Sequence, residues 1–153
     1  MPLAVCATPI GNLADITLRV LDELREADLV LCEDTRHTGV LLARHGIEAR
    51  ALQSYHRHNE ARRIAELLPR LAAGDRVALV SDAGLPGVND PGLRLVRAAL
   101  EAGVPVTVLP GPTAAAAALV LSGFDAEQFR FLGWLPRRAA RATARCPRCT
   151  GSK

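Results

Sequence analysis

Three segments of this 153-residue sequence combine glycine and proline with short polar side chains, at residues 8–12, 81–92 and 110–113. Each segment directly follows a short apolar run. Glycine lets a backbone approach a ligand closely, and proline stiffens a loop so that less order is lost on binding. For any one of these loops a simple turn is an equally good interpretation. Three such loops together favour a site for a small ligand.

The class of that ligand follows from the glycines that are missing. No G-x-x-x-x-G-K-[ST] string occurs, so a P-loop is not indicated. A dinucleotide fingerprint needs G-x-G-x-x-G after the first strand, but the first loop has only Gly11. Asp34 lies 23 residues after Gly11, near the expected place of a ribose-binding carboxylate. A ligand with a ribose but no phosphate, such as S-adenosylmethionine, fits this pattern.

Several side chains are candidate proton acceptors for a group-transfer reaction: His37, His56, His58, Asp34 and Asp82. Histidine titrates nearest to neutral pH, and His56 and His58 would leave the same face of an extended segment. Hydrogen-bonded surface histidines are the alternative, and Asp34 and Asp90 are equally well placed to cap helices. A metal site is not indicated, because nothing in the spacing fixes the geometry of the histidines. The catalytic base stays unassigned, with His56, His58 and Asp34 as candidates.

Basic side chains suggest contacts with nucleic acid. Arg36, Arg57, Arg62 and Arg63 are candidates for binding RNA phosphates, with a solvated helix face as the alternative. Aromatic residues make up only 3% of the chain, so stacking platforms for single-stranded RNA are not expected.

The elements that position these residues alternate along the chain. Apolar runs at 3–7, 29–32, 51–55, 76–81 and 106–109 predict strands, and 129–132 predicts a further short one. Helical spacing is found at about 15–27 (with Asp15 as N-cap), 37–44, 59–73, 91–102 (with Pro91 in its first turn) and 112–122. This order predicts an α/β fold: an open, mostly parallel sheet of about five strands with helices on both faces. Ligands bind such sheets at the carboxyl ends of the strands.

Charge divides the chain into two parts. Up to Glu127 there are 12 basic and 16 acidic residues, whereas from Gln128 onward there are seven basic residues and no acid. We therefore expect one domain at 1–135 and a basic, disordered tail at 136–153. Cys6 and Cys32 are expected to be buried thiols, and Cys146 and Cys149 form only half of a zinc site. No signal peptide and no apolar run near the ~20 residues of a membrane helix is found, which favours the cytoplasm.

Five motifs occur in order: A7-TPIGNLADI-T17, E33-DTR-H37, S54-YHRH-N59, S81-DAGLPGVNDP-G92 and L109-PGPT-A114. Together they resemble the ribosomal RNA small-subunit methyltransferase I group of the tetrapyrrole-methylase-like (class III) methyltransferases, from residue 3 to about 138. The resemblance implies the N-terminal domain of the tetrapyrrole methylase fold. It also implies 2′-O-methylation of a cytidine ribose in 16S ribosomal RNA, with S-adenosylmethionine as methyl donor, by a cytoplasmic homodimer that acts on this RNA or on the small ribosomal subunit.

The resemblance also implies which residues bind the donor. Matched by motif, the donor-site candidates are Thr8, Pro9, Gly11, Asp82, Ala83, Gly84, Pro86, Asp90, Gly111 and Pro112. After Arg138 the sequence departs from the group's pattern, and the second methylase domain is not expected in this chain. Two other interpretations stay open. One is a corrin or porphyrin precursor methylase of the same superfamily, and the other is a non-catalytic binding or dimerisation domain.

Overall fold

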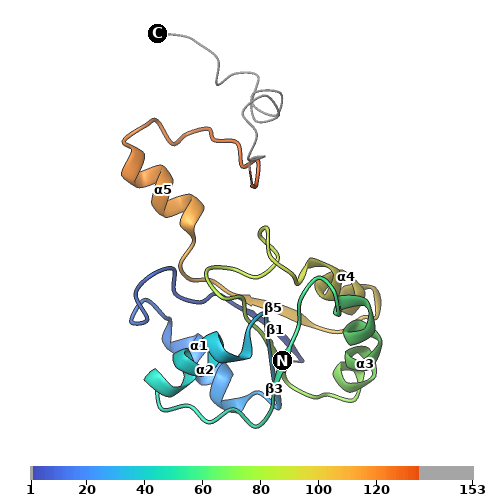
Figure 1. Ribbon diagram of the computed structural model, residues 1–153. Helices are drawn as coiled ribbons and strands as arrows, with labels where there is room; N and C mark the ends of the chain where they lie inside the picture. The colour runs from blue at the N-terminus through green and yellow to red at the C-terminus, as the bar shows by residue number, and fades with distance from the viewer. Residues whose placement is uncertain (1, 135–153) are drawn as a thin grey trace.

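Five strands alternate with five helices in the computed structural model, which describes residues 2–134 (Figure 1). The elements are β1 (Leu3–Cys6), α1 (Leu18–Glu26), β2 (Leu29–Cys32), α2 (Thr35–Arg44), β3 (Leu52–Ser54), α3 (Glu60–Ala72), β4 (Val77–Leu79), α4 (Leu93–Glu101), β5 (Val106–Leu109) and α5 (Ala114–Ser122). The strands form one sheet in the order β3-β2-β4-β1-β5, and every pair is parallel. The predicted α/β architecture is confirmed.

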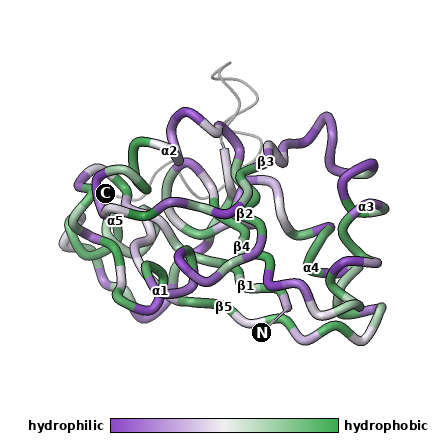
Figure 2. Tube along the Cα trace, turned by 90° about the horizontal axis from the view of Figure 1, so that it is seen from below, coloured by the Kyte–Doolittle hydropathy of each residue, from purple (hydrophilic) through white to green (hydrophobic). Residues whose placement is uncertain are grey.

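The strands are apolar throughout because both faces of the sheet are covered. Ala4 and Cys6 of β1 point into a core with α1 and α2, whereas Leu3 and Val5 point into a second core with α3 and α4. Figure 2 shows the strands lying between these two pairs of helices. A strand with two buried faces cannot alternate polar and apolar residues, which explains the uniform runs in the sequence.

Capping residues were predicted for three helices, and the structure confirms one of them. Asp34 caps α2 as expected, because its side chain accepts a hydrogen bond from the Arg36 amide. The N-cap of α1 is Thr17 and not Asp15, since residues 12–15 form a turn of their own. The N-cap of α4 is Gly92, so Asp90 and Pro91 lie before the helix. Gly92 has φ +135°, and a Cβ there would come within 2.9 Å of Leu79 Cδ2, so only glycine fits.

Helix α5 extends away from the sheet, and none of its residues is buried (Figure 1). The chain then returns over the carboxyl edge of the sheet. The short strand predicted at 129–132 is wrong, because this segment is irregular and does not run beside either edge strand. Among residues 2–134, no helix is long and apolar enough to cross a membrane.

Candidate functional site

A cavity of about 520 Å³ opens at the carboxyl edge of the sheet, and we call it the edge cavity. Its size is typical of sites for small ligands. It is lined by Ile10, Glu33, Asp82, Ala83, Gly84, Leu85, Val88, Asn89, Asp90, Thr113, Ala114, Ala115, Phe131, Gly133 and Trp134. The cavity therefore joins the loops that follow β1, β2, β4 and β5 with the segment that follows α5.

Two of the glycine and proline loops are joined by backbone hydrogen bonds. The Thr8 amide donates to the Gly84 carbonyl (2.8 Å), and the Gly84 amide donates to the Thr8 carbonyl (3.0 Å). The buried Thr8 hydroxyl donates to the Ser81 carbonyl at 2.9 Å. These bonds fix the first loop against the long loop, so the floor of the edge cavity is formed before a ligand binds.

The third loop packs closely on the end of β1. A Cβ at Gly111 would lie 2.9 Å from the Cβ of Ala7, so the close approach requires glycine at this position. The carbonyl of Pro112 lies 3.8 Å from where a Cβ of Gly84 would be. The loops after β1, β4 and β5 thus meet at one point.

Three carboxylates gather at the edge cavity: Glu33, Asp82 and Asp90. Partial burial raises the pKa of Glu33, and the nearby charges of Asp82 and Asp90 raise it further. Partial burial also raises the pKa of Asp90, while Arg57 opposes the shift. The protein therefore holds Glu33 and Asp90 in a place where their own negative charge is disfavoured. A positively charged ligand would relieve this repulsion.

Asp34 is engaged differently, although it is the next residue after Glu33. Its carboxylate accepts from the Arg36 amide (2.8 Å) and from Arg36 Nη2 (2.8 Å). These bonds hold its pKa at about 2. Its own amide donates to Asp82 Oδ1 at 3.2 Å. Asp34 is thus a helix cap that supports Asp82, and such a low pKa makes it a weak proton acceptor.

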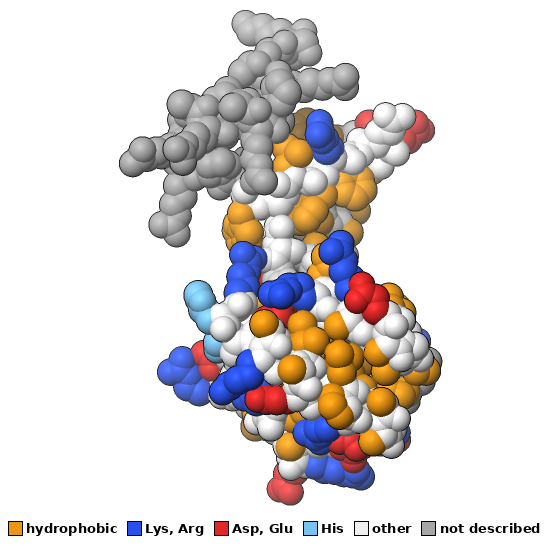
Figure 3. All heavy atoms as spheres, turned by 90° about the vertical axis from the view of Figure 1, so that its right-hand side faces the viewer, with side chains coloured by type: hydrophobic (Ala, Val, Ile, Leu, Met, Phe, Trp, Pro, Cys, Tyr) orange, Lys and Arg blue, Asp and Glu red, His pale blue; other side chains and the backbone are white. Residues whose placement is uncertain are grey.

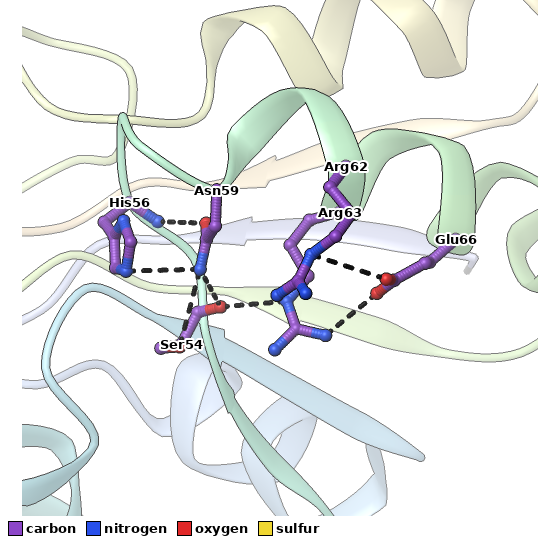
Figure 4. A network of polar contacts seen from close by, with 6 residues as sticks. All are labelled: Ser54, His56, Asn59, Arg62, Arg63 and Glu66. Carbon is purple, nitrogen blue, oxygen red and sulfur yellow. Dashed lines mark hydrogen bonds and ion pairs between the residues drawn. The ribbon is translucent and has the colours of Figure 1, made fainter.

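His56 lies in a polar corner between β3 and α3 (Figure 4). The His56 amide donates to Asn59 Oδ1 (2.9 Å), and Asn59 Nδ2 donates to the Ser54 carbonyl (3.0 Å) and lies 3.3 Å from His56 Nε2. Within the described part of the chain, His56 Nδ1 is buried without a hydrogen bond. His58 is exposed, with its ring centroid 5.9 Å from that of His56. Neither ring lines the edge cavity.

Arginines extend this corner along α3. Arg63 Nε donates to the Ser54 carbonyl (3.3 Å), and Glu66 pairs with Arg63 (2.9 Å) and with Arg62 (3.7 Å). The side chain of Arg63 is only 19% exposed, whereas that of Arg62 is 69% exposed. Arg63 therefore stabilises the corner between β3 and α3 through its contacts within the protein, while the side chain of Arg62 is exposed to solvent.

One arginine connects the polar corner to the edge cavity. Arg57 Nη2 donates to the Asn89 carbonyl at 2.6 Å. Asn89 has φ +66°, a left-handed conformation that asparagine tolerates better than most residues. Its side chain lies so close to Gly133 that a Cβ there would come within 2.7 Å of Asn89 Oδ1. Asn89 thus links the long loop to the β3–α3 corner and to the returning segment.

The sequence was compared with known proteins. The family model of the tetrapyrrole (corrin/porphyrin) methylases matches residues 2–144. The chain belongs to the tetrapyrrole methylase family. The resemblance inferred from the five motifs is therefore confirmed at the level of the family.

Curated relatives of this tetrapyrrole methylase carry the name "Ribosomal RNA small subunit methyltransferase I". The protein of Escherichia coli O157:H7 is 51% identical over 137 residues, which are 90% of this chain and 48% of the relative. The Micromonospora olivasterospora protein is 55% identical over 90% of this chain and 44% of the relative. The Thermotoga maritima protein is 49% identical over 88% and 60%. The chain spans about half the length of the curated relatives it matches.

Among solved structures, uroporphyrin-III-C-methyltransferase from Thermus thermophilus matches the fold of this tetrapyrrole methylase. The TM-score is 0.59 at 29% identity, over 82% of this chain and 53% of that one. A further structure, of the native form of the Thermus thermophilus enzyme, matches with a TM-score of 0.58 at 25% identity.

The structure places the ten donor-site candidates at one edge of the methylase sheet. Asp82, Ala83, Gly84 and Asp90 line the edge cavity. Thr8, Pro9 and Pro86 are buried, and Gly111 and Pro112 belong to the neighbouring loop. Gly11 is exposed, with nothing described within 4 Å of a Cβ placed on it, so it is the least connected of the ten.

The donor-site candidates did not include two polar residues of the edge cavity, Glu33 and Asn89. Both belong to loops that the sequence indicated, since Glu33 directly follows the apolar run at 29–32 and Asn89 lies in the segment 81–92. No pattern indicated Phe131 or Trp134, because they reach the cavity by the path of the chain after α5.

Neither of the two cysteines in the described part of the chain lines the edge cavity. Cys6 and Cys32 are free and buried, as predicted, and burial raises the pKa of Cys6 to about 12. Within residues 2–134, no group of three or more His, Cys, Asp or Glu side chains is arranged to hold a metal ion. Cys146 and Cys149, like the rest of the predicted basic tail, lie outside the described residues.

Proposed function

We propose that this chain binds S-adenosylmethionine in the edge cavity and serves the 2′-O-methylation of a cytidine ribose in 16S ribosomal RNA. A ribosomal RNA substrate is supported by the relatives, since proteins named ribosomal RNA small subunit methyltransferase I are 49–55% identical over about nine-tenths of the chain. Identity to the uroporphyrin-III-C-methyltransferase structure is only 29%, which makes a porphyrin precursor the weaker candidate.

The observation that carries the proposal is the composition of the edge cavity. Its lining combines three carboxylates (Glu33, Asp82 and Asp90) with apolar side chains such as Ile10 and Leu85. S-adenosylmethionine carries a positive sulfonium and an ammonium group, together with a flat, largely apolar adenine. Carboxylates stabilise the cations, and apolar walls accommodate the ring. A phosphate-bearing ligand would be repelled by the same three carboxylates.

The bound donor supplies an activated methyl group. Transfer of this methyl group from sulfur to the ribose 2′-oxygen would release S-adenosylhomocysteine, and a group of the protein or water would accept the hydroxyl proton. The loops after β1, β4 and β5 would hold the donor, because the hydrogen bonds of Thr8 with Ser81 and Gly84 fix them in advance. Such fixed positioning is the main contribution that a protein makes when the cofactor carries the reactivity.

The proton acceptor is also a proposal. Asp82 is the candidate that lines the edge cavity, and it accepts only one hydrogen bond, from the Asp34 amide, among the described residues. His56 and His58 belong to the adjacent corner and could reach the ribose of a bound RNA. Asp34 ranks last, because Arg36 holds its pKa at about 2. We also propose a cytoplasmic homodimer, with the folded domain at 1–135 and the tail at 136–153.

Isothermal titration of the purified chain with S-adenosylmethionine tests the proposal directly. We expect one donor molecule per chain. No detectable binding would support the alternative of a non-catalytic domain. Transfer of a radiolabelled methyl group to 16S RNA or to the small subunit, compared with transfer to uroporphyrinogen III, then separates the two enzyme interpretations. Methylation of the porphyrin precursor alone would exclude the RNA assignment.

A further inference from the structure

Charge changes sign across the carboxyl edge of the sheet. Because the strand order is β3-β2-β4-β1-β5, the loop after β2 lies beside the long loop after β4. The loop after β3 reaches the long loop through the hydrogen bond from Arg57 to the Asn89 carbonyl. The first two loops and the helices they open carry five exposed basic or imidazole side chains, whereas the edge cavity next to them holds three carboxylates. We call these five residues the basic corner: Arg36, His37, Arg57, His58 and Arg62.

The arginines of the basic corner have N–H groups that can donate to a ligand. Arg36 uses Nε and Nη2 on Asp34, but its side chain is 90% exposed, and a guanidinium carries five N–H donors. Arg62 is held only loosely by Glu66 at 3.7 Å. Figure 3 shows basic side chains and histidines at the level where the projecting segment joins the body of the molecule. The three arginines of this corner are exposed to solvent and carry a positive charge.

We propose that the basic corner binds the phosphate backbone of the acceptor RNA, with Arg57 at the boundary between RNA and donor. The inference rests on the proposed function. The methyl donor is cationic and the acceptor RNA is anionic, and the two must meet at the site. A site with only one sign of charge would repel one of them. The carboxylates of the edge cavity repel phosphates, so the strand must approach over the neighbouring cations.

Arg57 marks the boundary because it faces both ligands. It donates to the Asn89 carbonyl of the long loop. Its positive charge also opposes the rise in the pKa of Glu33 and of Asp90. Its remaining donors are available for a phosphate. Contacts to phosphates position an RNA strand but do not read its bases. Such contacts need no aromatic side chains to stack on the bases, and only 3% of the residues in this chain are aromatic.

Single substitutions test the assignment in the full 153-residue chain. The probe is a fluorescein-labelled oligocytidylate, and the readout is its Kd by fluorescence anisotropy over a series of salt concentrations. We expect Arg36→Gln and Arg62→Gln each to weaken binding about 3- to 10-fold at low salt, and to reduce the slope of log K against log salt by about 0.7. Arg57→Gln should have an effect on RNA at least as large.

Matched controls come from the same molecule. Arg44→Gln removes an identical charge at the other end of α2, and Arg97→Gln removes one on the exposed side of α4. Both variants keep the basic residues after Gln128, as do the test variants, and should bind RNA within about twofold of wild type. Equal losses in the controls would overturn the proposal. Equally effective competition by polyglutamate would overturn the assignment to RNA in favour of an acidic protein.

Titration with S-adenosylmethionine separates this inference from the proposed function. Arg36→Gln and Arg62→Gln should bind the donor as wild type does, because neither residue lines the edge cavity. Normal donor binding with no selective loss of RNA binding refutes the basic corner alone. Loss of RNA binding at the corner in a chain that binds no donor refutes the donor site alone.

Discussion

Neighbouring carboxylates in this protein have opposite properties because of their partners. Asp34 is stabilised as an anion by Arg36, while Glu33 faces the edge cavity with two other acids. The sequence shows the two residues side by side without distinguishing them. The difference comes from one helix cap and from the position of Glu33 at the edge cavity, and it supports the proposal that Glu33 binds the donor while Asp34 caps α2.

Replacing Glu33 by glutamine should weaken donor binding and stabilise the fold. A carboxyl whose pKa is raised in the folded state contributes stability at low pH that is lost as the pH rises through that pKa. At neutral pH the Glu33 charge is therefore a cost, and its removal should raise Tm by about 1–2 °C. Calorimetry should show about 10-fold weaker donor binding. Glu48→Gln, at an exposed site outside the cavity, is the control; equal effects there would contradict the prediction.

The same two pKa shifts predict how donor binding depends on pH. A cationic ligand needs Glu33 and Asp90 ionised, and both have pKa values above those of ordinary carboxyls. Affinity should therefore begin to fall at a higher pH than the value near 4 that is usual for such groups. Titrations between about pH 4 and pH 7 would detect the loss. In Arg57→Gln the fall should begin at a still higher pH, since Arg57 opposes both shifts. A constant Kd would exclude the carboxylates as donor ligands.

Local sequence patterns predicted the elements better than their ends. All five strands and five helices lie where apolar runs and helical spacing placed them, because each pattern is set by burial of that element alone. The starts of α1 and α4 were wrong, since they depend on a turn at 12–15 and on contact between Gly92 and Leu79. Contacts between distant segments leave no local pattern.

Gly84 of the long loop and Gly103 after α4 both have a left-handed backbone conformation. Gly84 and Gly103 have φ +78° and +71°, so alanine at either position should cost about 1–2 kcal/mol of unfolding free energy. Only at Gly84 would the new methyl lie near Ile10, at 3.6 Å from its Cγ2, inside the edge cavity. Urea denaturation should therefore give similar losses for both variants, and titration should show weaker donor binding only in Gly84→Ala. Weaker binding in both would indicate a general loss of fold.

For the molecule as a whole, the sequence predicted the position of α5 but not its surroundings. Helix α5 is apolar all round, a composition typical of a buried helix, yet Val120 is 78% and Leu121 86% exposed. Phe124, just beyond the helix, is 79% exposed. What covers such a surface depends on a partner, and a single sequence contains no pattern for it.

We expect two copies of the chain to associate through α5, because an exposed apolar surface of this kind is stabilised by contact with another apolar surface. Sedimentation velocity should show a concentration-dependent dimer, and Leu121→Lys should shift it to monomer, since a buried lysine at the contact would lose its hydration. Leu100→Lys is the control, because Leu100 is 59% exposed on α4, outside this surface. A wild-type monomer, or equal dissociation by the control, would refute self-association through α5. Donor binding by a monomeric Leu121→Lys variant would then show that one chain is enough to bind the donor.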